Sequence, residues 1–163
     1  MDLCRFSFGV TAAITTSLAL IVGLGAAHST KILLISTLLV LAIADNMTDS
    51  LSIHIYQESG PQYKDQDSNA RPKHKTIITT LSNFLTRFAV TIVFLLLVLS
   101  LPLQYAMISS VIIGLAVLSI LSYKIAINQK TSPYRAIFEH VGIAVVVIPT
   151  SYFIGQMIAA MGA

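Results

Sequence analysis

Long apolar stretches separated by short polar breaks dominate the chain. Each stretch has about the ~20 residues that an α-helix needs to cross a bilayer. The breaks carry residues that end helices, namely a Gly-Pro pair at 60–61, a proline at 102 and a Ser-Pro pair at 132–133. The pattern therefore predicts an all-α membrane protein with five transmembrane helices. These are expected at roughly 6–27, 32–56, 76–101, 103–127 and 135–160.

Composition supports this interpretation. Only 10% of the 163 residues are charged, against roughly 25% in a soluble domain, and the mean hydropathy is +0.81. So few charges could not cover the surface of a soluble protein of this length. The one long polar segment, at about 57–75, is too short to form a domain of its own. We therefore expect a single domain over residues 1–163, with that segment as a cytoplasmic loop.

The positions of the basic residues orient the predicted bundle. Eight of the ten Lys and Arg residues fall on one side of the membrane if the N-terminus is cytoplasmic. Lys31 falls on the other side, and Arg87 lies inside the third stretch. The positive-inside rule thus predicts a cytoplasmic N-terminus and an external C-terminus. We expect the plasma or inner membrane rather than a vacuole, and we expect the first helix to remain rather than to be cleaved as a signal peptide.

Several function classes are disfavoured. The net charge of +3 comes from loop residues rather than a basic stripe with interleaved aromatics, so we expect no nucleic-acid partner. The single cysteine, Cys4, cannot form an internal disulfide. No HExxH, CxxC, phosphate loop or nucleophile elbow is present, so we expect neither enzymatic activity nor a bound cofactor.

Charged residues inside the predicted helices are the main candidates for function, because charge is costly at membrane depth. Asp45 and Asp49 are four residues apart, so their carboxylates share one helix face. With a rise of ~1.5 Å per residue, Arg87 lies roughly 16 Å into its helix, at about the depth of Asp45. An Asp–Arg contact is therefore expected. Asn46 and Met47 could add oxygen and thioether ligands for a divalent ion.

This pattern leaves alternatives open. An arginine neutralised by one aspartate could simply hold two helices together. One arginine cannot neutralise both aspartates, however, so the second carboxylate would need a proton, a metal ion or water. Two neighbouring carboxylates are also candidate proton carriers. In a third alternative, Arg87 binds a different, anionic solute.

A second polar cluster is expected near the cytoplasmic ends of the helices. His54 and Glu58 lie four residues apart at the end of the second stretch, and Glu139 and His140 lie one turn into the fifth. Together they could collect a metal ion, with Asp45 and Asp49 as the deeper ligands. The alternative is that they are interfacial side chains that reach water.

Two segments resemble the vacuolar iron transporter family. The first stretch, FGVTAAITTSLALIVGL, is similar to the family's opening helix, and Phe8, Gly9, Gly23 and Leu24 fit its pattern in register. The last segment resembles the family's closing helix, with matches at Lys124, Ser132, Pro133, Gly142, Tyr152 and Gly155. The resemblance implies a transporter that moves Fe2+ or Mn2+ out of the cytoplasm in exchange for protons. It also implies a homodimer that meets through the first helix.

The chain departs from the family pattern at the ion path. The family's first-helix Asp-Gly falls on Ala12 and Ala13, while Asp49 stands for a family glutamate. Asp45 stands where the family has methionine, and the large cytoplasmic metal-binding insert is absent. The resemblance thus implies a compact, divergent transporter in which Asp45 and Asp49 serve the ion path and Arg87 is a counter-charge. A membrane protein that keeps the fold without transporting anything is the competing hypothesis.

Overall fold

The computed structural model describes residues 3–59 and 72–162, and this part of the chain contains helices and no strand. Five helical rods are present, and each is long and apolar enough to cross a membrane. The second rod consists of three consecutive elements that continue one another. The elements are α1 (Leu3–Ala26), α2 (Lys31–Val40), η1 (Leu41–Asp45), α3 (Asn46–Ser59), α5 (Pro72–Ser100), α6 (Leu103–Asn128) and α7 (Pro133–Met161).

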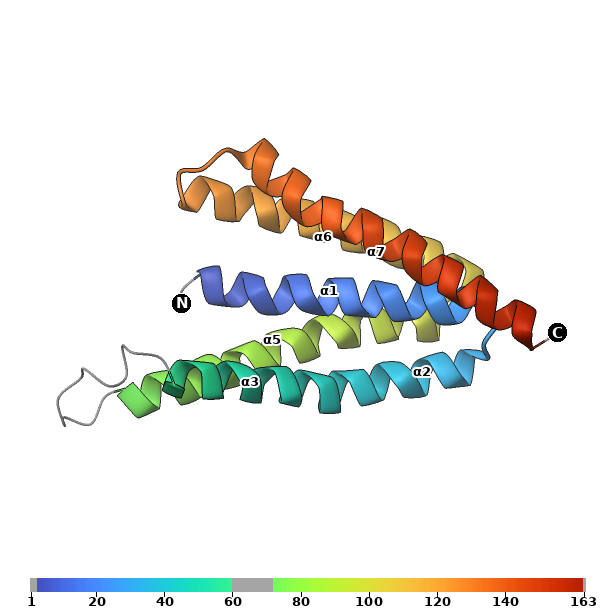
Figure 1. The fold of residues 1–163 in the computed structure, drawn as a ribbon, viewed down its shortest axis with the longest axis horizontal. Coiled ribbons are helices and arrows are strands. Elements are labelled where there is room, and N and C mark those ends of the chain that lie inside the picture. The colour runs from blue at the N-terminus through green and yellow to red at the C-terminus, as the bar shows by residue number, and fades with distance from the viewer. Residues whose placement is uncertain (1–2, 60–71, 163) are drawn as a thin grey trace.

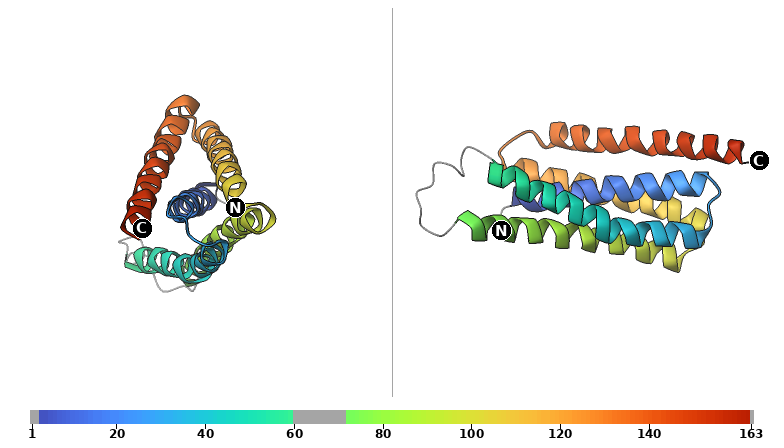
Figure 2. Two further views of the ribbon diagram at one scale, coloured as in Figure 1. Left: turned by 90° about the vertical axis from the view of Figure 1, so that its right-hand side faces the viewer. Right: turned by 60° about the horizontal axis from the view of Figure 1, so that its bottom comes forward.

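Helix α1 lies at the centre of the bundle. The end-on view shows the other rods arranged around it (Figure 2), and α1 packs against α2, α5, α6 and α7. From the side, α1 lies between the α6–α7 pair and α3 (Figure 1), whereas α5 contacts α6 directly. The N- and C-terminal ends of the described chain lie at opposite ends of the bundle, as an odd number of antiparallel rods requires.

The distribution of side chains is the one expected for a bundle surrounded by lipid. Polar residues such as Ser110 and Ser122 of α6 are buried, whereas the isoleucines at 108, 112 and 120 of the same helix are exposed. Small and polar residues are enriched at helix contacts in membranes, where lipid gives no hydrophobic driving force. Here they share the interior with large apolar residues such as Leu18 and Leu38, which are fully buried. The pattern fits an integral multi-pass membrane protein.

Short connections at the ends of the helices are held by specific backbone hydrogen bonds. After α1, His28 adopts a left-handed conformation (φ 54°), and the N–H groups of His28 and Ser29 bond back to the carbonyls of Gly25 and Leu24. This is a Schellman motif, and it satisfies carbonyls that the helix end leaves unpaired. Thr30 then starts α2 by accepting a hydrogen bond from the N–H of Leu33.

Lys31, the one basic residue predicted on the external side, has a structural role. Its Nζ donates to the carbonyls of Leu99 (2.9 Å) and Leu101 (3.0 Å) at the end of α5. A cation is favourable at a helix C-terminus because the unpaired carbonyls there carry partial negative charge. Lys31 therefore joins the start of α2 to the end of α5.

The five predicted helices are confirmed, with end shifts of a few residues and one internal difference. The expected second helix, 32–56, is interrupted by a π-helical turn over η1. The expected break at Pro102 does separate α5 from α6. Most of the predicted loop at 57–75 lies outside the described residues, and the predicted orientation in the membrane stays a prediction.

Candidate functional site

The guanidinium of Arg87 is the centre of the candidate site. Arg87 lies on α5, is 1% exposed, and reaches across to the second rod. Its Nε donates to Asn46 Oδ1 (2.8 Å) and its Nη2 to Asp45 Oδ2 (3.0 Å). Its Nη1 lies 2.6 Å from Asp49 Oδ2, an ion-pair contact without the alignment of a hydrogen bond. One arginine thus contacts both aspartates.

The π-helical turn explains how Asn46 is positioned. In an α-helix the backbone N–H of residue 46 would bond to the carbonyl of residue 42. Here that N–H bonds to the carbonyls of Leu41 and Ile43, and the side-chain Nδ2 of Asn46 donates to the carbonyl of Ala42 instead (3.0 Å). The side chain therefore repairs the bond that the turn disrupts, and its Oδ1 accepts the hydrogen bond from Arg87. Such π-bulges occur frequently at functional sites.

The two carboxylates are much less buried than the arginine that they contact. The side chains of Asp45 and Asp49 are 44% and 43% exposed, although Asp45 lies near the middle of the candidate span Lys31–Gln57. Two carboxylates and one guanidinium leave one negative charge in excess. Charged side chains in membranes face a bundle interior or a water-filled cavity rather than lipid. The exposed sides of these carboxylates therefore need water, a cation or another protein chain.

Further polar side chains from α3 and α5 surround Arg87. Asn83 Nδ2 donates to Ser50 Oγ (3.1 Å), and Thr91 Oγ1 donates to the carbonyl of Arg87 (2.9 Å). The Oδ1 of Asn83 is buried and accepts no hydrogen bond. It lies against Gly9 of α1, where a Cβ would come within 2.8 Å of it. The absence of a side chain at Gly9 thus lets α1 approach this polar layer.

The structure brings together most residues of the predicted ion-path group. Asp45, Asn46, Asp49 and Arg87 are in direct contact, although the sequence predicted an Asp–Arg pair with one aspartate left over. Met47 is 58% exposed and makes none of these contacts. The π-turn was not predicted, because nothing in residues 41–45, four apolar residues followed by Asp45, distinguishes them from an ordinary helix.

The predicted cytoplasmic cluster is not assembled as a metal site in the described part of the chain. His54 Nδ1 is hydrogen-bonded to Thr80 of α5 (3.2 Å), and His140 Nδ1 to Ser122 of α6 (2.9 Å). Glu139 pairs with Arg135 on the exposed side of α7 (2.9 Å). The side chain of Glu58 lies outside the described residues. Among residues 3–59 and 72–162, no group of three His, Cys, Asp or Glu side chains could hold a metal ion.

Comparison of the chain with models of protein families, with curated proteins and with solved structures gave no match. The resemblance to the vacuolar iron transporters therefore stays an expectation from the sequence. What the structure itself provides is a five-helix bundle with an Asp–Arg–Asp cluster in its second and third rods.

Proposed function

We propose that this chain transports a cation across a membrane, and that the Asp45–Arg87–Asp49 cluster is its binding site. A divalent metal ion, Fe2+ or Mn2+, is the substrate that the resemblance implies, and it would move out of the cytoplasm in exchange for protons. The observation that supports the proposal is a pair of half-exposed carboxylates at membrane depth, held side by side by one buried arginine. A site with excess negative charge favours a cation.

In this proposal Arg87 acts as a built-in counter-cation. With no substrate present, its guanidinium offsets part of the charge of the two carboxylates. A divalent ion that binds both carboxylates balances their charge fully and leaves Arg87 without its ion-pair partners. An unpaired buried charge is unfavourable, so the occupied site would favour release or a change of conformation. Protons that bind the carboxylates would likewise compete with both Arg87 and the metal ion.

The proposal includes the setting of the site. We place the protein in the plasma or inner membrane, as a homodimer that meets through α1. The other helices leave part of α1 uncovered at the half-buried residues Thr11, Ala12, Thr15 and Thr16, and this small-residue surface is where we place the contact. A second copy there would shield polar groups from lipid.

A structural role is the second candidate, and it too has an observation in its favour. Arg87 finds an acceptor or a counter-charge at each of its three nitrogens, which would join α3 to α5 without any substrate. The binding of an anionic solute at Arg87 has less support, because a 1% exposed guanidinium with two carboxylates around it offers no free face to an anion.

Mn2+ binding by the purified protein separates these candidates. We expect saturable binding by the wild type and its loss in Asp49→Asn, in which Asp45 still pairs with Arg87. The control is Glu139→Gln, which removes a carboxylate from an exposed ion pair on α7. At 100 times the Kd, Mn2+ should also stabilise the wild type by about 2.7 kcal/mol. Equal binding by all three proteins, or binding by none, would contradict the proposed site.

A further inference from the structure

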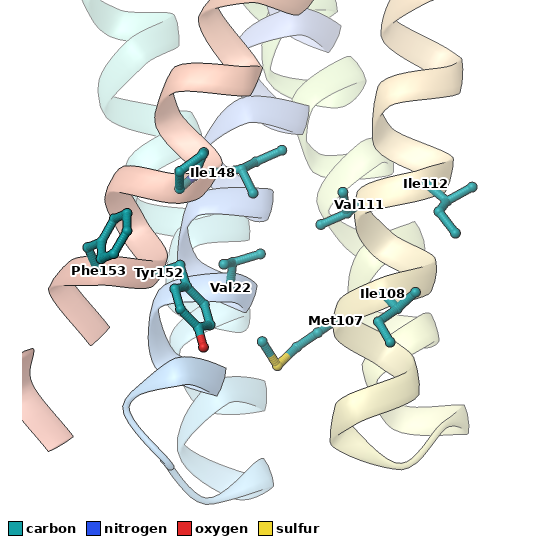
Figure 3. Close-up of a pocket in the computed structure, with 9 residues that line it drawn as sticks. Val22, Met107, Ile108, Val111, Ile112, Ile148, Tyr152 and Phe153 are labelled. Atoms are coloured by element: carbon teal, nitrogen blue, oxygen red, sulfur yellow. The ribbon is translucent and has the colours of Figure 1, made fainter. Parts of the chain in front are cut away.

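Two adjoining pockets lie between α1, α6 and α7 at the end of the bundle that carries the α1–α2 turn. The first pocket, about 450 Å3, is an open groove lined by apolar side chains of the three helices. Val22, Met107 and Tyr152 approach one another in it, with Val111 and Ile148 further from the turn (Figure 3). Its volume is within the range of roughly 300–1,000 Å3 found for ligand sites.

The second pocket, about 410 Å3, lies nearer the turn, and its lining includes polar as well as apolar side chains. Met107 and Tyr152 line both pockets, so the two adjoin. The polar groups around the outer pocket include His28, Gln104 and Gln156. Gln156 Nε2 donates to the carbonyl of Ala26 (3.3 Å) and to the hydroxyl of Tyr152 (3.4 Å), which holds these polar groups at the opening.

Met107 lies at the junction of the two pockets because α1 has no side chain there. A Cβ at Gly25 would overlap Met107 Sδ. The thioether thus packs directly on the backbone of α1. Together the two pockets form a groove that has its polar side chains at the end of the bundle and is apolar further in.

From these features we propose that the groove binds one acyl chain of a bilayer lipid, with the lipid's polar head at the outer pocket. The distance from Gln104 to Ile112 is about 12 Å at ~1.5 Å per residue. This is close to half of the ~30 Å hydrocarbon core, the depth that one leaflet's chains occupy. The polar outer end of the groove would face the lipid's head group, and the apolar inner part would face its acyl chain.

The lining also indicates which head group fits. No Asp, Glu, Lys or Arg is among the residues that line the two pockets. Amide, imidazole and phenol groups instead offer hydrogen bonds without a fixed charge. A lipid with a head of no net charge, such as phosphatidylcholine, therefore fits better than an anionic lipid. This inference does not depend on the proposed transport.

The test is photolabelling of the purified protein in phosphatidylcholine vesicles that contain phosphatidylcholine with a diazirine on its acyl chain. Mass spectrometry should locate the adducts on Met107, Val111 and Tyr152. Val111→Phe fills the groove and should lose these adducts. Val117→Phe makes the same change on α6 outside the pockets and should keep them. Ile148→Phe, from the α7 wall, provides a second filling variant if Val111→Phe does not fold.

Three results would overturn the proposal. The first is labelling spread evenly over the exposed face of α6, and the second is equal labelling of Val111→Phe and Val117→Phe. The third is crosslinking between two copies of the chain at Ile108, which would show that a second protein chain occupies the groove. In a further experiment, anionic lipid replaces half of the vesicle lipid while the amount of photoprobe is kept constant. A loss of labelling there would contradict the preference for an uncharged head group, which is one part of the proposal.

Discussion

The buried guanidinium of Arg87 depends on the carboxylates that contact it. Removing a charge from water is costly, and the cost is offset only while counter-charges and hydrogen bonds remain in place. Asp45 and Asp49 supply the counter-charges, and Asn46 supplies a neutral acceptor at Nε. Because Arg87 contacts two carboxylates rather than one, neither carboxylate alone is indispensable for folding.

Neutralising the carboxylates one at a time and together should expose this redundancy. Asp45→Asn and Asp49→Asn should each have a modest effect on stability, because Arg87 keeps the other carboxylate. The double variant leaves Arg87 unpaired and should lower the free energy of unfolding by about 3–5 kcal/mol. Adding Arg87→Met to the double variant should restore most of the loss. Thermal unfolding in detergent provides the measurement.

Each outcome of that series has a distinct meaning. A double variant as stable as the wild type would show that Arg87 does not rely on these carboxylates. A triple variant that remains as unstable as the double variant would show that the lost stability comes from something other than an unpaired charge.

Asn46 should matter for folding more than its neutral side chain suggests. Asn46→Leu removes the acceptor of Arg87 Nε and the donor to the Ala42 carbonyl in the π-turn. Leaving buried polar groups unsatisfied costs about 1–3 kcal/mol each. The neighbouring Met47→Leu, at an exposed position, should change the free energy of unfolding by less than about 0.5 kcal/mol. Equal losses in the two variants would argue against this role of Asn46.

The sequence was informative about some of these residues and silent about others. Charge at membrane depth identified Asp45, Asp49 and Arg87, because a helical rise converts sequence position directly into depth. The bond from Asn46 to the Ala42 carbonyl depends on the π-turn, and residues 41–45 carry no sequence signal for such a turn. The contact of Gly9 with Asn83 joins α1 to α5, and no local pattern specifies which faces of two helices meet.

At the scale of the elements, α1 and α7 cross at two glycines. A Cβ at Gly155 of α7 would overlap the carbonyl oxygen of Gly23 of α1. Backbone-to-backbone contact of this kind is how small residues allow helices to approach closely in membranes. The contact helps to explain why α1 can lie at the centre of the bundle.

Alanine substitutions at two glycines of α7 test this contact. Gly155→Ala should destabilise the protein by about 1–3 kcal/mol, since the backbone must shift to make room. Gly142→Ala provides the matched control, because a Cβ there has nothing within 4 Å. The control should leave stability unchanged or raise it by about 0.5–1 kcal/mol, as alanine favours the helix. Thermal unfolding of both variants would detect the difference, and a similar effect at both positions would refute the close crossing.

The positions of the helices were predictable because long apolar runs and prolines determine them almost alone. The breaks at Pro102 and before Pro133 coincide with the observed ends of α5 and the start of α7. The packing of the helices against one another was harder to predict from the sequence. That α1 is central follows from small residues on several of its faces, and the sequence does not show which partner each face meets.

At the scale of the whole molecule, orientation in the membrane follows from the distribution of charge. Reporter fusions in the segment 62–68 should be cytoplasmic, and fusions after residue 163 should be external. The structure is consistent with termini on opposite sides of the membrane, because the first and last described residues lie at opposite ends of the five-rod bundle. A cytoplasmic C-terminus would contradict a five-span topology.

Cation transport is the central claim, and Mn2+ uptake into vesicles of purified protein tests it most directly. Vesicles loaded with a fluorescent chelator should report uptake by the wild type and by Glu139→Gln above the level of protein-free vesicles. Asp49→Asn should fold, because Asp45 still pairs with Arg87, but it should lose uptake because the site then has no excess negative charge. Absence of uptake by the wild type, with and without a proton gradient, or undiminished uptake by Asp49→Asn, would contradict the claim.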